Sequence, residues 1–164
     1  MTRRLLTLPQ PLVLDADGIN ALSGHIDTLS CRRGLTTVLT PHDGELARIG
    51  GDMTAPRESS AAFAARHGVC LVRKGHRTVI AAPDGRLAVN TTGSDGMAKG
   101  GSGDVLTGLL TGLLAQGVEP FAACCCAVWL HGRAGDLAAE EKGHRGMTPA
   151  DMIEKLPYAL KEVE

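Results

Sequence analysis

Thr91-Thr92-Gly93-Ser94-Asp95-Gly96-Met97-Ala98-Lys99-Gly100-Gly101-Ser102-Gly103-Asp104 is the stretch that decides how the rest of the chain is interpreted. It holds five glycines in fourteen residues, and an apolar pattern of helical spacing follows from Val105 to Leu114. A glycine-rich turn that leads into a helix presents unpaired N–H groups and the positive end of the helix dipole. Glycine also lets the backbone approach a ligand closely. We therefore expect a phosphate-binding turn.

Asp104 would lie beside the bound anion. A carboxylate does not suit a pure phosphate cradle, but it suits a base that acts on an alcohol directed at that phosphate. The alternative is a flexible loop followed by a helix-capping aspartate. The length of the loop and the immediate start of the helical pattern favour the site.

Two well-known phosphate motifs do not fit this stretch. A P-loop requires Gly-Lys-Ser/Thr at its end, whereas Lys99 precedes the two glycines Gly100 and Gly101. A dinucleotide-binding turn requires a third glycine where Leu106 stands.

Composition narrows the class of protein. With 164 residues, 43% hydrophobic and 21% charged, we interpret residues 1–164 as a single globular domain. A net charge of −1 and an aromatic content of 2% argue against nucleic acid as a partner. The apolar segments are too short for a membrane span or a signal peptide, which predicts a cytoplasmic protein.

The five cysteines give no metal-ligand spacing. Cys124, Cys125 and Cys126 are consecutive on a predicted helix, so their side chains diverge by about 100° and cannot share one metal ion. We interpret the cysteines as reduced, and the triplet mostly as small core residues.

Strand and helix signals alternate in the first half of the chain and helices dominate the second. This order predicts an α/β fold with a mainly parallel sheet flanked by helices, and one hairpin around Pro83-Asp84-Gly85. The expected strands are 11–14, 36–40, 69–72, 78–81 and 87–90, and the expected helices start near 19, 42, 54, 104, 119 and 148.

Three polar clusters follow the expected parallel strands. They are residues 15–20, 42–45 and 74–78. Because ligands collect beyond the carboxyl ends of parallel strands, we expect these clusters to meet the glycine-rich turn.

Five stretches of the chain match a known family, and they are 11–22, 40–45, 74–78, 90–107 and 130–136. Through these stretches the chain resembles the carboxyl-terminal part of the NAD(P)H-hydrate dehydratase family, which has a ribokinase-like fold. Gly-Ser-Gly-Asp at 101–104 is shared with other ribokinase-like kinases, and its combination with Pro-His-Asp-Gly-Glu is more specific.

The resemblance implies a lyase that restores hydrated NADH or NADPH. ADP or ATP would phosphorylate the hydrate hydroxyl, and phosphate would then leave, with Mg²⁺ as the counter-ion of the nucleotide. Asp104 would be the catalytic base, and it would contact the hydrate together with His42. The residues implied to bind nucleotide are Lys74, Gly75, His76, Arg77, Thr78, Gly101, Ser102 and Gly103.

Several of these residues also have simpler interpretations. His42 after a proline can cap the next helix, and Lys74 can be a solvated turn residue. Asp15 can cap or make a turn as well as bind magnesium, and we expect His131 and Asp136 to be structural. Ser94 and Lys99 replace the asparagine of most family members and the threonine of many.

Family members generally carry roughly a hundred further residues before the strand at 11–14. The chain is therefore expected to lack amino-terminal strand–helix units, and to form a homo-oligomer or to need a partner chain that supplies them. Two alternatives remain open. One is a kinase of the same fold that phosphorylates a vitamin precursor, and the other is an inactive nucleotide-binding fragment.

Overall fold

The structure, a computed structural model, describes residues 2–164, with side chains from Arg4 onward. A five-stranded sheet with the order β1-β2-β3-β4-β5 forms its centre. The first three strands are parallel, and β3, β4 and β5 pair antiparallel. The strands are β1 (Leu12–Leu14), β2 (Thr37–Leu39), β3 (Cys70–Arg73), β4 (Val79–Ala81) and β5 (Leu87–Val89).

Alternating side chains of the central strands enter two separate cores. Leu39 and Leu71 pack with Leu46 and Phe63 on one face of the sheet. Their neighbours along the strands, such as Val38, pack on the other face. Both faces are apolar because successive side chains of a strand point to opposite sides. Cys70 and Cys124 are buried in this second core. Of the cysteine triplet, Cys124 is a core residue as expected, Cys125 is half-buried and Cys126 is exposed.

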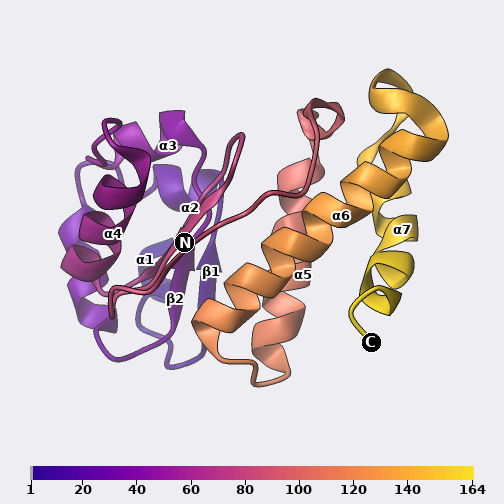
Figure 1. The fold of residues 1–164 in the computed structure, drawn as a ribbon. Helices are drawn as coiled ribbons and strands as arrows, with labels where there is room; N and C mark the ends of the chain where they lie inside the picture. Colours follow the sequence, from indigo (N-terminus) through magenta and orange to yellow (C-terminus); the bar gives the residue numbers. More distant parts are fainter. Residues whose placement is uncertain (1) are drawn as a thin grey trace.

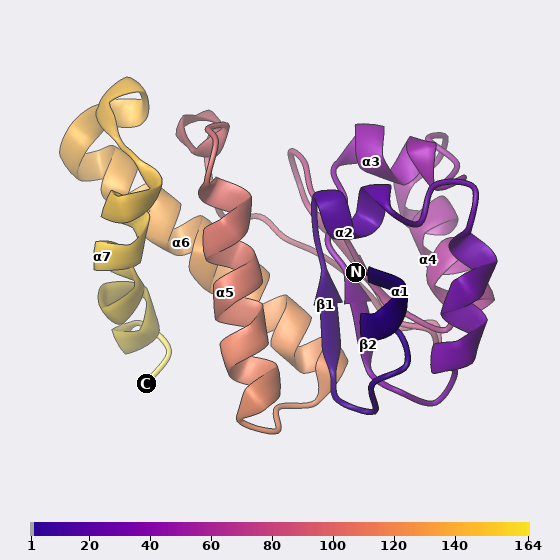
Figure 2. The ribbon, with the colours of Figure 1, turned by 180° about the vertical axis from the view of Figure 1, so that it is seen from behind.

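Helices cover both faces of the sheet, as Figure 1 and the reverse view in Figure 2 show. One face carries α4, while α5 and α6 cover the other, and α7 packs on the outer side of α5 and α6. The helices are α1 (Thr2–Leu5), α2 (Asp17–Asn20), η1 (Ile26–Arg32), α3 (Asp43–Arg48), α4 (Pro56–His67), η2 (Asp95–Met97), α5 (Ser102–Ala115), α6 (Pro120–Gly146) and α7 (Pro149–Lys161).

Most helix boundaries agree with the sequence signals. Pro56 opens α4, and Gly68 ends it with a φ of 66°. Thr148 caps α7 in a capping box with Asp151. In α6 the helical φ and ψ are interrupted at Gly143, two residues after the expected end at Glu141, and a short turn continues from there to Gly146. None of the helices in residues 2–164 has the length and apolarity to cross a membrane.

Arg32 is almost fully buried and joins the amino-terminal segment to the sheet. Its guanidinium donates to the backbone oxygens of Leu6, Leu8, Gln10 and Thr36, and its Nε donates to the Thr37 hydroxyl. Burial lowers the pKa of Arg32 from its ordinary value. The five contacts compensate the loss of water around this side chain.

Residues 92–99, which we call the strap, connect the hairpin to α5 and lie against α6 (Figure 1). Thr92 lies directly on Gly132 of α6. The contact is so close that a Cβ at position 132 would come within 2.2 Å of the Thr92 hydroxyl oxygen. Gly135 leaves the same kind of space for Met97, whose sulfur would lie 2.4 Å from an added Cβ. The two glycines thus give α6 a surface without side chains, on which the strap packs; we call this surface the track.

Replacing Gly132 should damage this contact. The added methyl group of Gly132→Ala would also lie 2.8 Å from the Thr92 backbone, which cannot rotate away. We expect a loss of about 1–3 kcal/mol in the free energy of unfolding, measured by urea denaturation. Gly112→Ala is the matched control, because α5 offers open space there, and it should raise stability by about 0.5–1 kcal/mol. Equal stability of the two variants would contradict this packing.

Candidate functional site

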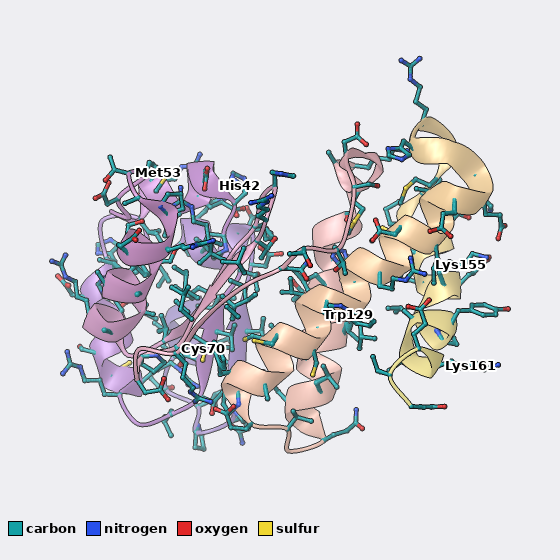
Figure 3. The ribbon with its side chains drawn as sticks, viewed as in Figure 1. His42, Met53, Cys70, Trp129, Lys155 and Lys161 are labelled. Carbon is teal, nitrogen blue, oxygen red and sulfur yellow. The ribbon has the colours of Figure 1, made fainter. Side chains whose placement is uncertain are left out.

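The three parallel strands finish at the same end of the sheet, so their carboxyl ends lie side by side. His42 and Lys74 form an isolated parallel bridge, and the Lys74 amide donates to the Pro41 carbonyl oxygen at 2.8 Å. The Lys74 ammonium lies 2.7 Å from a carboxylate oxygen of Asp15. Figure 3 shows His42 at this edge, with Cys70 at the opposite end of the sheet. The structure therefore brings the three polar clusters together.

A cavity of about 680 Å³ opens between this edge, the strap and the first turn of α5. The predicted residues that line it are His42, the loop 74–78, Ser102 and Gly103. Gly101 and Asp104 belong to the same turn but are not among its lining residues. Residues 92–99 on this wall belong to the glycine-rich stretch 91–104, although no individual binding role was predicted for them. The lining residues outside the predicted binding and catalytic set are Asn90, Thr92, Gly93, Ser94, Asp95, Met97, Ala98, Lys99, Leu106, Val128, His131 and Gly132.

The first turn of α5 has the conformation of an anion-binding turn. Gly101 precedes the helix with a φ of 93°, and no side chain of the described residues caps the helix. The Ser102 amide donates to the Lys99 carbonyl oxygen, and the amides of Gly103 and Asp104, the next two of α5, are left for a ligand at the positive end of the helix dipole. A Cβ at Gly103 would lie 3.4 Å from the Lys74 ammonium nitrogen, so the glycine keeps the turn close to the lysine.

Asp15 holds Lys74 next to this turn. One carboxylate oxygen accepts from Lys74 and from the Ala16 amide at 2.9 Å, and the other accepts from the Thr107 hydroxyl at 3.0 Å. The Asp15 and Lys74 side chains are 12% and 22% exposed, so water screens the pair only partly. Lys74 is thus a positioned cation beside the α5 terminus, and not a free turn lysine.

His42 caps α3 and also lines the cavity. Its Nδ1 accepts from the amides of Gly44 and Glu45, and the Glu45 carboxylate accepts from the His42 amide. An accepting Nδ1 places the ring proton on Nε2. The side chain remains 59% exposed, and the Nε2 atom is 3.6 Å from Glu45. The capping role therefore fixes the ring and its tautomer while its outer edge stays accessible.

His131 joins α6 to the first turn of α5. Its Nε2 lies 2.9 Å from the Ser102 carbonyl oxygen and 3.3 Å from the Ser102 hydroxyl. Burial lowers the pKa of His131 to about 4, and the positive charge of Lys74 adds to this shift. A neutral imidazole with its proton on Nε2 donates to the carbonyl oxygen, as expected for a structural histidine.

Asp136 has a related role. Its carboxylate accepts from the Gly93 amide at 3.0 Å and holds the start of the strap on α6. The Thr92 hydroxyl lies 3.0 Å from the Trp129 carbonyl oxygen, one helical turn from Gly132. In the sequence, the only signal for this track is the pair of glycines at 132 and 135, spaced to lie on one helix face.

Comparisons with known proteins identify the family of the chain. A protein-family model described as NAD(P)H-hydrate dehydratase matches residues 1–158. The chain belongs to the NAD(P)H-hydrate dehydratase family. A bifunctional NAD(P)H-hydrate repair enzyme of Moorella thermoacetica is 45% identical over 159 residues, which cover 94% of this chain and 30% of that protein.

Solved structures extend the family assignment to the fold. The ADP/ATP-dependent NAD(P)H-hydrate dehydratase of Bacillus subtilis, co-crystallised with ATP and Mg²⁺ and soaked with CoA, is 32% identical with a TM-score of 0.81. A ribokinase-like superfamily protein of Enterococcus faecalis is 28% identical with a TM-score of 0.78. Both alignments cover 98% of this chain, and 59% and 58% of those proteins. The expected ribokinase-like α/β fold is confirmed, and the chain spans 30% to 59% of the length of these relatives.

The buried His131 should make stability depend on pH. Its pKa in the folded protein, about 4, lies below the ordinary 6.5, so between these values the unfolded chain binds a proton that the folded chain does not. Stability is fully present above pH 6.5 and falls as the pH drops toward 4. From pH 7 to pH 5 the loss should be about 2 kcal/mol.

Urea unfolding of the parent and of His131→Gln at both pH values measures this contribution. The variant should lose less stability than the parent between pH 7 and pH 5, because it has no imidazole to protonate in the unfolded chain. An identical pH dependence in the two proteins would show that the His131 imidazole is protonated as easily in the folded state as in the unfolded state.

Proposed function

We propose that this chain carries the nucleotide site and the catalytic base of an ADP- or ATP-dependent dehydratase for hydrated NADH and NADPH. The observation that carries the proposal is the convergence of Lys74, the first turn of α5 and the strap on one cavity, in a chain of this family. The dehydratase of Bacillus subtilis, which was co-crystallised with ATP and Mg²⁺, supports the nucleotide.

The nucleotide phosphates would lie at Gly101, Ser102 and Gly103. The amides of the first turn would stabilise the phosphate charge, and Lys74 would add a cation from the opposite wall. The loop Gly75 to Thr78 would line the AMP portion. In this loop the Thr78 hydroxyl lies within hydrogen-bond distance of the Gly75 carbonyl oxygen at 3.2 Å, and Arg77 adopts a φ of 59°.

Asp104 would act on the hydrate from the accessible side of the same turn. It is exposed, it directly follows Gly103, and it is not among the residues that line the nucleotide cavity. A base there takes the proton of the hydrate hydroxyl while that oxygen attacks the terminal phosphorus of the nucleotide. The bond between this phosphorus and the bridging oxygen breaks, and AMP leaves from ADP, or ADP from ATP, with the bonding electrons. The C–O bond of the phosphate ester then breaks, phosphate leaves with the bonding electrons, and loss of the neighbouring C5 proton restores the 5,6 double bond. His42 would contact the hydrated dinucleotide through its exposed edge.

Magnesium fits this site as an ion that the nucleotide brings. Among the described residues no group of three or more His, Cys, Asp and Glu side chains could hold a metal. Mg²⁺ commonly binds through one or two carboxylates plus phosphate oxygens, and Asp15 and Asp104 are the carboxylates beside the turn. When bound, the ion would neutralise charge on the transferred phosphoryl group.

A kinase that stops after phosphorylation is not favoured. The family model and the repair-enzyme relatives match nearly the whole chain, including the Pro41 to Glu45 stretch that such a kinase would not require. An inactive nucleotide-binding module remains the competing hypothesis, because it would share the cavity. The two hypotheses differ in one measurable property: the dehydratase has a turnover that depends on Asp104, and the inactive module has none.

Two substitutions in neighbouring residues separate binding from catalysis. Asp104→Asn should leave ADP and ATP affinity near the parental value and lower turnover by roughly 10²–10⁴-fold, the usual contribution of a general base. Gly103→Val should instead weaken nucleotide binding, because a Cβ already reaches 3.4 Å from both Lys74 and Asp15 and the added methyl groups fill the turn.

Calorimetric titration gives the affinities, and absorbance of reduced cofactor formed from hydrated NADH gives turnover. The assay uses the preparation in which the parent is active, either the chain alone or the chain supplemented with the expected amino-terminal units. A parental rate in Asp104→Asn would remove Asp104 as the base. Nucleotide binding without turnover by the parent in either preparation would favour the inactive module.

We further propose that the protein self-associates or binds a partner chain. The sheet has β1 and β5 at its edges, and the backbone groups of an exposed edge pair readily with another chain. Light scattering at several concentrations should give a mass above the 17.1 kDa of one chain if the protein self-associates. If it needs a partner chain, the mass should rise above this value only when the partner is added. A monodisperse 17.1 kDa species with full dehydratase activity would contradict this proposal.

A further inference from the structure

Lys99 lies at the end of the strap, and its ammonium is bound by backbone oxygens. The Nζ atom donates to the carbonyl oxygens of His144 at 3.1 Å and Arg145 at 3.0 Å, and also to that of Met147. An ammonium has three N–H donors, and these three acceptors use all of them. The Lys99 charge is therefore already engaged by α6 and the turn toward α7, although the residue lines the nucleotide cavity.

The end of α6 is suited to receive this cation. Gly143 leaves the helical conformation with a φ of 74° and a ψ of 154°, so the chain turns there toward α7. Carbonyl groups at a helix end lack intrahelical partners and form the negative end of the helix dipole. Lys99 satisfies them from a segment that is 45 residues away in the sequence.

The strap packs closely around this anchor. A Cβ at Gly96 would lie 2.7 Å from the Met147 sulfur and 3.0 Å from the His144 backbone. Asp95 pairs with the His144 imidazole on the outer side. The strap is thus attached to α6 along its whole length, from Thr92 on Gly132 to Lys99 on the α6–α7 turn.

Lys99 is the last residue before the two flexible glycines of the phosphate turn. Gly100 has open space around it, and Gly101 has a positive φ. Because neither residue has a side chain, neither holds the turn in place by packing. The Ser102 amide donates to the Lys99 carbonyl oxygen at 3.3 Å. The turn is therefore fixed from both sides, upstream by Lys99 and downstream by the His131 contact with Ser102.

We propose that Lys99 is a positioning residue for the nucleotide site. By binding the carbonyl oxygens at the end of α6, it holds the strap wall and the first amides of α5 in the geometry that receives phosphate. It does so without contacting the phosphate itself. This inference rests on the proposed nucleotide-dependent function, since a positioning role requires a nucleotide to position.

The test compares the parent with Lys99→Met, Lys99→Arg and a matched control. Lys155→Met is the control, because Lys155 also joins α7 to α6, through Glu141, and lies on α7 away from the cavity (Figure 3). Two quantities are measured on each protein. One is amide hydrogen exchange of residues 94–103 without ligand, and the other is the dissociation constant for ADP at low and high salt.

In Lys99→Met we expect exchange of the strap amides to be at least roughly tenfold faster, and the dissociation constant for ADP to be roughly tenfold higher. Lys99→Arg, which keeps the donors and the charge, should restore both quantities to within about threefold. Lys155→Met should leave both unchanged. If Lys99→Met does not fold, Lys99→Gln takes its place and should show the same direction of change.

Three outcomes would overturn the inference. Parental exchange and affinity in Lys99→Met would show that the strap needs no anchor. Weaker ADP binding with unchanged exchange, and with less salt dependence than the parent, would show that Lys99 contacts phosphate directly. If the parent bound no ADP or ATP at all, the proposed function would fail together with the positioning role, and the exchange data would still show whether Lys99 anchors the strap.

Discussion

The contact of Thr92 with Gly132 is the constraint on which the site depends. It is possible because α6 has glycine at positions 132 and 135, where Thr92 and the Met97 side chain lie against the helix backbone. The strap can then follow α6 closely, and the cavity is bounded by a wall with fixed position. A surface loop is otherwise expected to be mobile, and the packing of the strap, including its short helix η2, on α6 explains how it can serve a binding site.

The charged side chains around the phosphate-binding turn are held by fixed partners. Lys74 has Asp15 as its partner, and Lys99 has carbonyl oxygens, so the two lysines that line the cavity are both held before any nucleotide arrives. Holding a cation in place reduces the conformational entropy that ligand binding must remove. His131 contributes differently, since burial keeps it neutral and its hydrogen bond to Ser102 adds no charge near the phosphates.

Much of the fold could be predicted from the sequence, because it follows from local patterns. Apolar runs bounded by proline and glycine predicted the strands, and the Thr148 capping box predicted the start of α7. The convergence of Asp15, His42 and Lys74 followed from a general rule for parallel sheets and is present. The roles of the individual residues in binding and catalysis stay predictions.

The strap could not be predicted in the same way, because its structure depends on contacts between distant residues. Nothing near Lys99 in the sequence indicates that its partners are the carbonyl oxygens of residues 144, 145 and 147. The capping role of His42 was foreseen as an alternative to a binding role, and the structure shows that one ring serves the cap while still facing the cavity. The expected end of α6 at Glu141 lies two residues before Gly143, where the helical φ and ψ are interrupted, and only the short turn that follows to Gly146 was not predicted.

Arg32 has a consequence for how this chain can vary. Four of its five acceptors are backbone carbonyl oxygens, which every amino acid provides. The exposed side chains of Leu8 and Gln10 can therefore be exchanged freely without loss of the contacts that join their segment to β2. The single guanidinium cannot be exchanged in this way, because no other side chain offers so many donors in one plane. The attachment of the amino-terminal segment therefore depends on the side chain of one residue, Arg32 of η1, while the side chains of the segment itself can change.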